Sequence, residues 1–264
     1  MVGLTSLISQ RFGQSLAGLL SGLPVIAATV TALLMTEASR EQVVAVAQAT
    51  YLSAPAAFAY TIAFAWVARW VADSPSRSAF KAWVERKRIQ AWCVCFILAA
   101  GVFIATSVLM LTFNTNPAWG AALALLCPAL ALMLMPRLAS NAPMSFQIPK
   151  RELSLRMLVA FLMALVLLWS AGHLSPSLSG IILTWPVTGS VLPCFTVALY
   201  GAQATIQLLR GFANGLLGFT AFFVILSQLL KAGWPYTSSF LVSAIVASSA
   251  AWLLMRFRQQ VRAW

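Results

Sequence analysis

The chain has 264 residues, of which 61% are hydrophobic and only 8% are charged. Soluble domains are about 45–50% apolar and about 25% charged, so a soluble fold of this length could not bury so many apolar side chains. The net charge of +12 comes from 17 basic and 5 acidic residues. The basic residues stand in short segments between apolar runs, which is typical of membrane topology signals and argues against a nucleic-acid-binding face. The composition predicts a polytopic membrane protein.

Several apolar runs are long enough to cross a bilayer as helices, which takes about 20 residues each. We expect eight such spans, at residues 13–36, 50–71, 91–112, 118–136, 154–173, 177–199, 211–230 and 236–256. Turn-forming or charged residues separate them. Runs of this length indicate helices, because strands of a membrane β-barrel have only about 9–11 residues. The predicted fold class is an all-α transmembrane helical bundle.

The distribution of basic residues predicts the orientation. If the N-terminus is cytoplasmic, all basic residues except Arg40 and Lys231 lie on the cytoplasmic side. We therefore expect a multi-pass protein of a bacterial inner membrane with both termini in the cytoplasm. The largest basic segment, 73–90, also carries Phe80 and Trp83. It is expected to form a short interfacial helix on anionic lipid, or alternatively a solvated loop.

An internal repeat relates the two halves of the chain. Residues 15–25 align with residues 177–187 at an offset of 162, with five of eleven positions identical. With the predicted spans, equivalent helices run in opposite directions, which is the inverted-repeat plan of many secondary transporters. A chance likeness between two Gly/Ser/Leu-rich helices is the alternative. The repeat divides the chain into a first unit whose opening helix is truncated, a linker span with a basic loop, and a second unit, at residues 1–112, 113–153 and 154–264.

Part of the second unit resembles a known family. Leu178-Ser179-Gly180, Pro186, Ala198-Leu199-Tyr200-Gly201 and the stretch 204–210 are similar to the small four-helix GlpM-type inner-membrane proteins, over about residues 154–256. The resemblance implies a helical inner-membrane protein associated with envelope polysaccharide production. The family's acidic residue before Ala-Leu-Arg is replaced here by Thr205 or Gln207, so no role of that carboxylate carries over.

Residues able to carry catalysis are scarce. His173 is the single histidine, and the five acidic residues all stand at span ends or between spans. Neither a nucleophile with its base nor a pair of carboxylates can be assembled within the membrane. The four cysteines lie inside apolar runs and are expected to be buried free thiols. We expect no enzymatic activity, metal or cofactor, and a substrate that is neutral, amphipathic or anionic.

Two prolines, Pro24 and Pro186, stand near the middle of equivalent predicted spans. A proline removes a backbone hydrogen bond, and in lipid the freed groups need neighbouring hydroxyls or water. Breaks at corresponding positions of two repeats indicate a transport site. An ordinary kink packed on Gly18 and Gly22 is the alternative. The candidate substrate-binding residues at the breaks are Ser21, Pro24, Thr184, Trp185, Pro186 and Ser190.

Arg210, at the start of a predicted span, is the last candidate substrate-binding residue. It either reaches a lipid phosphate from the helix end or faces the repeat interface and holds an anionic head group.

These features favour a small transporter or flippase-like protein for a lipid or an envelope precursor. The alternative is a non-transporting membrane subunit that scaffolds envelope polysaccharide biosynthesis. A transporter requires a cavity between the repeats, lined by Ser21, Thr184 and Trp185, whereas a scaffold requires a packed centre. The oligomeric state is left open.

The orientation can be tested by cysteine labelling in a variant without the four native cysteines. An impermeant thiol reagent added to intact cells should label the outer connections, represented by cysteines placed at positions 116, 175 and 238. Cytoplasmic positions 76, 140 and 260 should be protected. Labelling from outside at position 76 or 140 would reverse the orientation.

Overall fold

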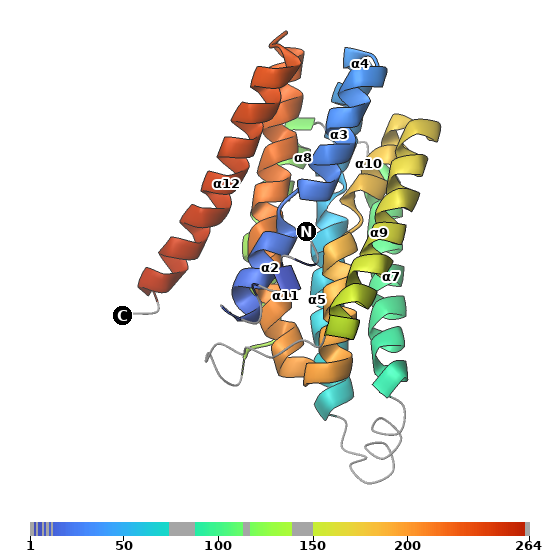
Figure 1. Ribbon diagram of the computed structural model, residues 1–264. Helices are drawn as coiled ribbons and strands as arrows, with labels where there is room; N and C mark the ends of the chain where they lie inside the picture. Colours follow the sequence, from blue (N-terminus) through green and yellow to red (C-terminus); the bar gives the residue numbers. More distant parts are fainter. Residues whose placement is uncertain are drawn as a thin grey trace.

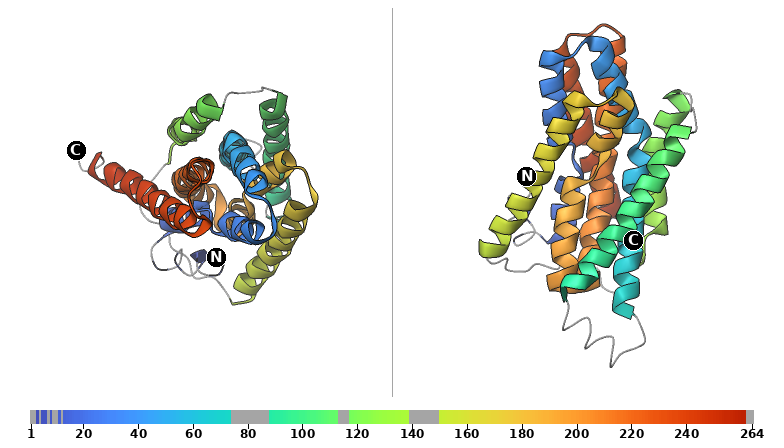
Figure 2. Two further views of the ribbon diagram at one scale, coloured as in Figure 1. Left: turned by 90° about the horizontal axis from the view of Figure 1, so that it is seen from above. Right: turned by 90° about the vertical axis from the view of Figure 1, so that its right-hand side faces the viewer.

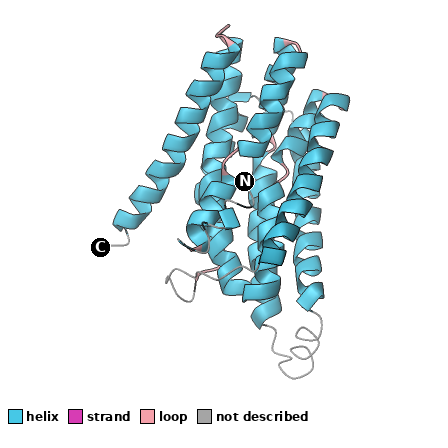
Figure 3. Cartoon of the chain, in the orientation of Figure 1, coloured by secondary structure: helices cyan, strands magenta, loops and turns pink. Residues whose placement is uncertain are grey.

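The computed structural model describes residues 13–73, 88–112, 117–138 and 150–261, together with a few residues between 3 and 11. Every regular element in this part of the chain is an α-helix, and the longer helices run side by side in one bundle (Figures 1 and 3). The predicted all-α class is confirmed. The predicted interfacial helix at 73–90 and the truncated helix expected at the start of the first unit lie largely outside the described residues.

Two of the apolar runs are broken at a proline, and a third is interrupted at Ser53, whose φ and ψ remain in the helical region. In chain order the helices are α2 (Gln14–Gly22), α3 (Val25–Glu37), α4 (Arg40–Leu52), α5 (Ala54–Asp73), α7 (Arg88–Thr112), α8 (Pro117–Leu134), α9 (Lys150–His173), α10 (Pro176–Thr184), α11 (Val187–Lys231) and α12 (Tyr236–Val261). The pair α2–α3 forms the first broken helix. The second consists of α10 and the first part of α11.

The element α11 is two helices joined at Gly201. This residue has φ 82° and ψ −178°, a conformation that only glycine adopts without strain. The chain reverses there, so that the parts of α11 on either side of Gly201 lie next to each other (Figures 1 and 2). Helix resumes well before residue 211, where the next span was expected. The polar side chains of Thr205 and Gln207 lowered the hydropathy of this stretch, yet both are buried in the bundle.

Length and composition make the bundle a membrane protein. Five described segments are long and apolar enough to cross a bilayer, at residues 14–37, 40–71, 91–112, 176–231 and 236–253. Shorter apolar helices cover 118–134 and 153–163. Many large apolar side chains on α7, α8 and α9 are exposed, among them Ile104 and Val166. Such a surface is stable in hydrocarbon and would aggregate in water.

The connections at residues 38–39, 174–175 and 232–235 lie at one end of the bundle (Figure 1). Arg40 joins two of them, because its guanidinium donates to the carbonyls of Leu230 at 3.2 Å and Trp234 at 2.9 Å. It also stacks over the Tyr236 ring at 5.1 Å. Leu230 is in the last turn of α11, where a helix leaves its carbonyls without partners of their own, and its carbonyl accepts from the N–H of Gly233 as well as from Arg40.

The centre of the bundle depends on close contact between α2 and the second part of α11. A side chain at Gly18 would overlap the carbonyl of Leu208, and one at Gly215 would overlap the carbonyl of Leu19. Gly22 and Gly215 face each other across the same interface. Small residues at this spacing let two helix backbones approach directly, as in other membrane helix pairs.

We expect Gly18→Ala and Gly215→Ala to destabilise the protein, because the added methyl group overlaps backbone that cannot rotate away. Overpacking of this kind costs about 1–3 kcal/mol. The matched control is Gly101→Ala on α7, where a side chain meets nothing within 4 Å. Thermal unfolding in detergent should show lower midpoints for the first two variants alone. An equal loss in Gly101→Ala would show that the packing is not responsible.

Candidate functional site

The first helix break lies between α2 and α3. The N–H of Leu23 donates back to Leu20 at 3.4 Å, and the N–H of Val25 donates to Leu23 at 2.8 Å instead of continuing the helix. Pro24, which has no N–H, stands between them with φ −77° and ψ 32°. Helical bonding resumes when the N–H of Ala28 donates to the Pro24 carbonyl.

The second break, between α10 and α11, has the same backbone bonding at residues 162 positions later. The N–H of Trp185 donates to Ile182 at 3.0 Å, and that of Val187 donates to Trp185 at 2.9 Å. Pro186 again has helical φ, −79°, with ψ displaced to 76°. Two prolines in similar sequences therefore produce the same pair of backbone hydrogen bonds, although ψ is larger at Pro186 and its carbonyl accepts from the Ser190 hydroxyl, where that of Pro24 accepts from the Ala28 N–H.

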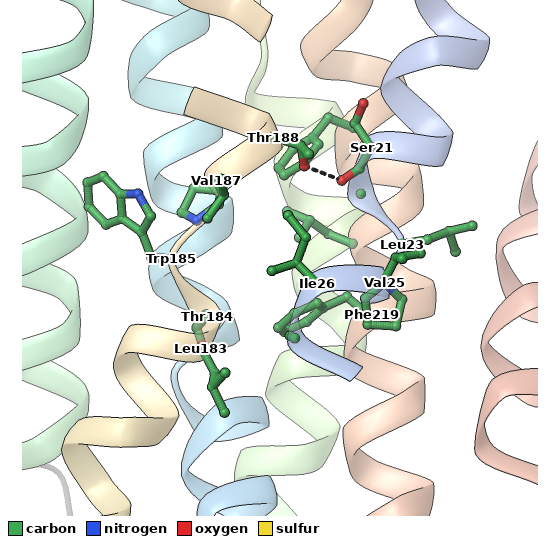
Figure 4. A pocket seen from close by; sticks show the side chains of 16 residues that line it. Ser21, Leu23, Val25, Ile26, Leu183, Thr184, Trp185, Val187, Thr188 and Phe219 are labelled. Carbon is green, nitrogen blue, oxygen red and sulfur yellow. Dashed lines mark hydrogen bonds between the residues drawn. The ribbon is translucent and has the colours of Figure 1, made fainter. Parts of the chain in front are cut away.

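The two breaks lie against one buried cavity of about 40 Å³ (Figure 4). At about 10–15 Å³ per water, this cavity has room for a few small polar molecules. The predicted residues Ser21, Pro24, Thr184, Trp185 and Pro186 all line it. A third wall comes from the second part of α11, through Phe212, Leu216 and Phe219.

A side-chain hydrogen bond joins the two breaks. The Thr188 hydroxyl donates to the carbonyl of Ser21 at 2.6 Å (Figure 4). In a continuous helix that carbonyl would accept from the N–H of Val25, which here turns to Leu23. The hydroxyl of Ser21 donates locally to Ala17. Thr188 therefore satisfies a carbonyl that the break in the other helix has freed.

Thr184 connects the second break to α4. Its hydroxyl is buried and donates to the carbonyls of Gly180 at 2.8 Å and Thr50 at 2.9 Å. The Ser190 hydroxyl donates to Pro186 at 2.7 Å, but Ser190 is not among the lining residues of the cavity. Its contribution is to the backbone on the α11 side of the break.

Each broken helix packs on the half of the chain to which it does not belong. Gly18 of α2 lies against the backbone N–H of Phe212, and Gly180 of α10 lies against that of Thr50. Gly18 and Gly180 differ by 162 positions, and so do Thr50 and Phe212. Gly22 adds a third example, because it faces the Phe212 carbonyl and corresponds to Thr184, which donates to Thr50.

The second half of each broken helix begins at the cavity. A helix leaves its first N–H groups without partners of its own. Within the described part of the chain, the N–H groups of Ile26 and Ala27 in α3, and of Thr188 and Gly189 in α11, have no backbone acceptor. Three of these four residues line the cavity. Two positive helix ends therefore face a space without acidic side chains.

Arg210 lies elsewhere in the bundle. Its guanidinium donates to the carbonyls of Pro136 at 2.9 Å, Leu132 at 3.4 Å and Met135 at 3.5 Å. These carbonyls end α8, so the charge satisfies a helix C-terminus and complements its dipole. The structure places the Arg210 guanidinium at the end of α8 and does not bring it to the breaks.

The sequence did not predict the bridging role of Thr188 or the aromatic wall from α11. The internal repeat offered one signal for the wall from α11, because its offset of 162 residues makes Phe212 equivalent to Thr50. Among the described residues, no group of His, Cys, Asp and Glu is arranged to hold a metal ion. Cys93, Cys95, Cys127 and Cys194 are free thiols, and Cys95 is fully buried.

Comparisons of the chain with protein-family models, curated proteins and solved structures find no match. The class that the structure defines is an all-α membrane protein with two broken helices that meet at a buried cavity.

We expect Thr188→Val to destabilise the protein, because it leaves the buried Ser21 carbonyl without a partner, at a cost of about 1–3 kcal/mol. Thr196→Val is the matched control. Thr196 is equally enclosed, but its hydroxyl donates only to Leu192, four residues back in its own helix. Thermal unfolding in detergent should separate the two variants. Equal midpoints would mean that the bond between the breaks contributes nothing of its own.

Proposed function

We propose that this protein is a small transporter or flippase-like protein of the bacterial inner membrane, built from two inverted repeats. The observation that carries the proposal is the meeting of two helix breaks, with the same backbone bonding, at one buried cavity. Broken helices at corresponding positions of two repeats are the usual construction of substrate sites in secondary transporters. The inference from this construction to transport is one of analogy.

The reciprocal contacts support the inverted repeat. In an arrangement with a two-fold axis, a contact between residue i of one unit and residue j of the other is matched by a contact between residue j of the first unit and residue i of the second. Gly18 with Phe212, and Gly180 with Thr50, satisfy this condition at an offset of 162. A two-fold axis between the breaks accounts for both contacts at once.

The positions of the chain reversals support eight passes through the membrane. The connections at 38–39, 174–175 and 232–235 lie at one end, and the reversal within α11 lies at the other (Figure 1). Described helices join these ends alternately, including the shorter α8. Arg69 near the end of α5, Arg88 at the start of α7 and Lys150 at the start of α9 stand at helix ends opposite those three connections, which supports a cytoplasmic location of both termini.

The cavity favours a substrate without positive charge. None of its lining side chains is ionisable, and two helix N-termini point toward it. At about 40 Å³ it is too small for a lipid head group, so the two breaks would have to separate to admit one. The choice of an envelope precursor as cargo rests on the resemblance to GlpM-type proteins alone.

The alternative, a scaffolding subunit, is favoured by the glycine contacts between α2 and α11, which leave the centre tightly packed. In that case both breaks are packing kinks, and the exposed apolar faces of α7 and α9 are docking surfaces.

Reconstitution separates the two proposals. We expect the full chain, in vesicles of phosphatidylethanolamine and phosphatidylglycerol, to accelerate the flipping of fluorescent phosphatidylglycerol, measured by dithionite reduction. Pro186→Ala restores a backbone donor and allows α10 and α11 to become continuous. It should slow flipping by about tenfold or more, equivalent to about 1.4 kcal/mol in the barrier, with abundance and thermal midpoint near wild type. Thr184→Val should also slow flipping, but with a lower thermal midpoint, because it leaves the buried carbonyl of Thr50 without its side-chain donor.

The matched control is Pro128→Ala, which removes a helix proline from α8, away from the cavity. It should flip lipid at the wild-type rate. A scaffold predicts the reverse pattern, in which Pro186→Ala lowers stability and abundance. A wild-type protein that moves no lipid, together with that pattern, would reject the transporter for this class of cargo.

A further inference from the structure

A second cavity, larger and apolar, lies beside the helix breaks. Its volume is about 420 Å³, within the range of about 300–1,000 Å³ of small-molecule sites. It lies between α7, α9 and α10, and the described side chains that line it include Phe103, Met163, Ile181 and Ile182, all apolar. Figure 2 shows α7 and α9 on either side, with α10 between them. We call this cavity the lateral groove.

The depth of the lateral groove limits what can occupy it. Phe103 is nine residues from the outer end of α7, Met163 is ten from that of α9, and Trp185 follows nine residues of α10. At about 1.5 Å per residue, all three lie about 14 Å below the outer helix ends. This is near the middle of a hydrocarbon core about 30 Å thick. At that depth the protein is surrounded by the hydrocarbon chains of the lipids.

The lateral groove opens to the lipid. Leu162 and Val166, which form its α9 wall, are 53% and 63% exposed, and the neighbouring Ile104 on α7 is 59% exposed. The opposite wall is enclosed, since Phe103 is 3% exposed. A chain can enter sideways from the bilayer without crossing a polar surface.

Trp185 belongs to the linings of both the lateral groove and the cavity at the breaks. Its indole points toward α7, away from Ser21 (Figure 4). There it packs edge-on against Phe103, with ring centroids 4.9 Å apart, and against Tyr60 at 5.8 Å. Trp185 therefore contributes its backbone to the second break and its ring to the wall that closes the lateral groove.

We propose that the lateral groove holds a hydrocarbon chain of the transported molecule, with Trp185 as the partition between the chain and the polar break. The proposal rests on the proposed function and narrows its cargo to an amphiphile that enters from the bilayer. The chain occupies the groove while the polar end approaches the two helix N-termini. Movement of the Trp185 ring joins the two spaces.

Photo-crosslinking tests this. The full chain is reconstituted in vesicles of phosphatidylethanolamine and phosphatidylglycerol containing phosphatidylglycerol with a mid-chain diazirine, and cross-linked residues are mapped by mass spectrometry. Labelling at Met163 and Ile182 should saturate as the probe fraction rises and should fall on addition of unlabelled phosphatidylglycerol. Labelling at Ile104, at the same depth but facing lipid, should rise linearly.

Met163→Trp fills the lateral groove and should reduce the saturable labelling of Ile182 at least fivefold. Leu165→Trp, an equal enlargement at an exposed position of α9 outside the lining, should leave it unchanged. Linear labelling at Met163 and Ile182, or no effect of Met163→Trp, would overturn the proposal, because the groove would then hold only ordinary bilayer lipid.

The outcomes for the groove and for transport are separable. Pro186→Ala should slow flipping and leave the saturable labelling in place. If the wild-type protein shows saturable labelling but flips no lipid, the lateral groove is a lipid site and the lipid bound there is not transported. Rapid flipping with linear labelling would reject the groove and retain the transporter.

Discussion

A backbone hydrogen bond broken in the middle of a membrane has to be replaced by another, because lipid offers no partner. Pro24 and Pro186 each break a helix at such a depth, and the remainder of the bundle is arranged around that requirement. The breaks are brought together, so that Thr188 beside one can donate to the Ser21 carbonyl freed by the other. Bringing them together requires α2 to lie directly on α11, which only a glycine-lined surface permits. The glycines, the prolines and the hydroxyls are thus parts of one arrangement.

Some of the backbone hydrogen bonds lost at the two breaks are not replaced. For that reason the place where the breaks meet is a candidate functional site. The first N–H groups of α3 and α11 end at a small cavity with no backbone acceptor among the described residues. The breaks are also not equivalent in their side chains. Position 188 carries a threonine that bridges the breaks, whereas its counterpart at 26 is isoleucine, which cannot donate. The two breaks therefore share a pair of backbone hydrogen bonds, while their side chains differ in polarity.

Charged side chains lie away from the two breaks and bind carbonyls at helix ends. Arg40 binds one carbonyl in the last turn of α11 and one in the connection that follows, and Arg210 binds the carbonyls that end α8. In a bundle whose centre holds no ionisable group in the cavity lining, these contacts fix helix ends without adding charge to the site. The proposed lateral groove continues the same separation, because an apolar chain and a polar end would occupy adjoining spaces divided by Trp185.

The sequence by itself determined the class of protein, the helical fold and the positions of both breaks. Hydropathy, proline and glycine act within one helical turn or one span, so they can be recognised along the chain. The repeat at an offset of 162 also identified Ser21, Thr184 and Trp185 as neighbours of one cavity. Only the tertiary structure decided that Thr188 bonds to Ser21 and that Phe212 forms a wall of the site. It also decided that Arg210 binds the carbonyls at the end of α8, away from the breaks. These contacts join residues that are 74 to nearly 200 positions apart. They depend on which faces of the helices meet, and hydropathy in so apolar a chain distinguishes faces poorly.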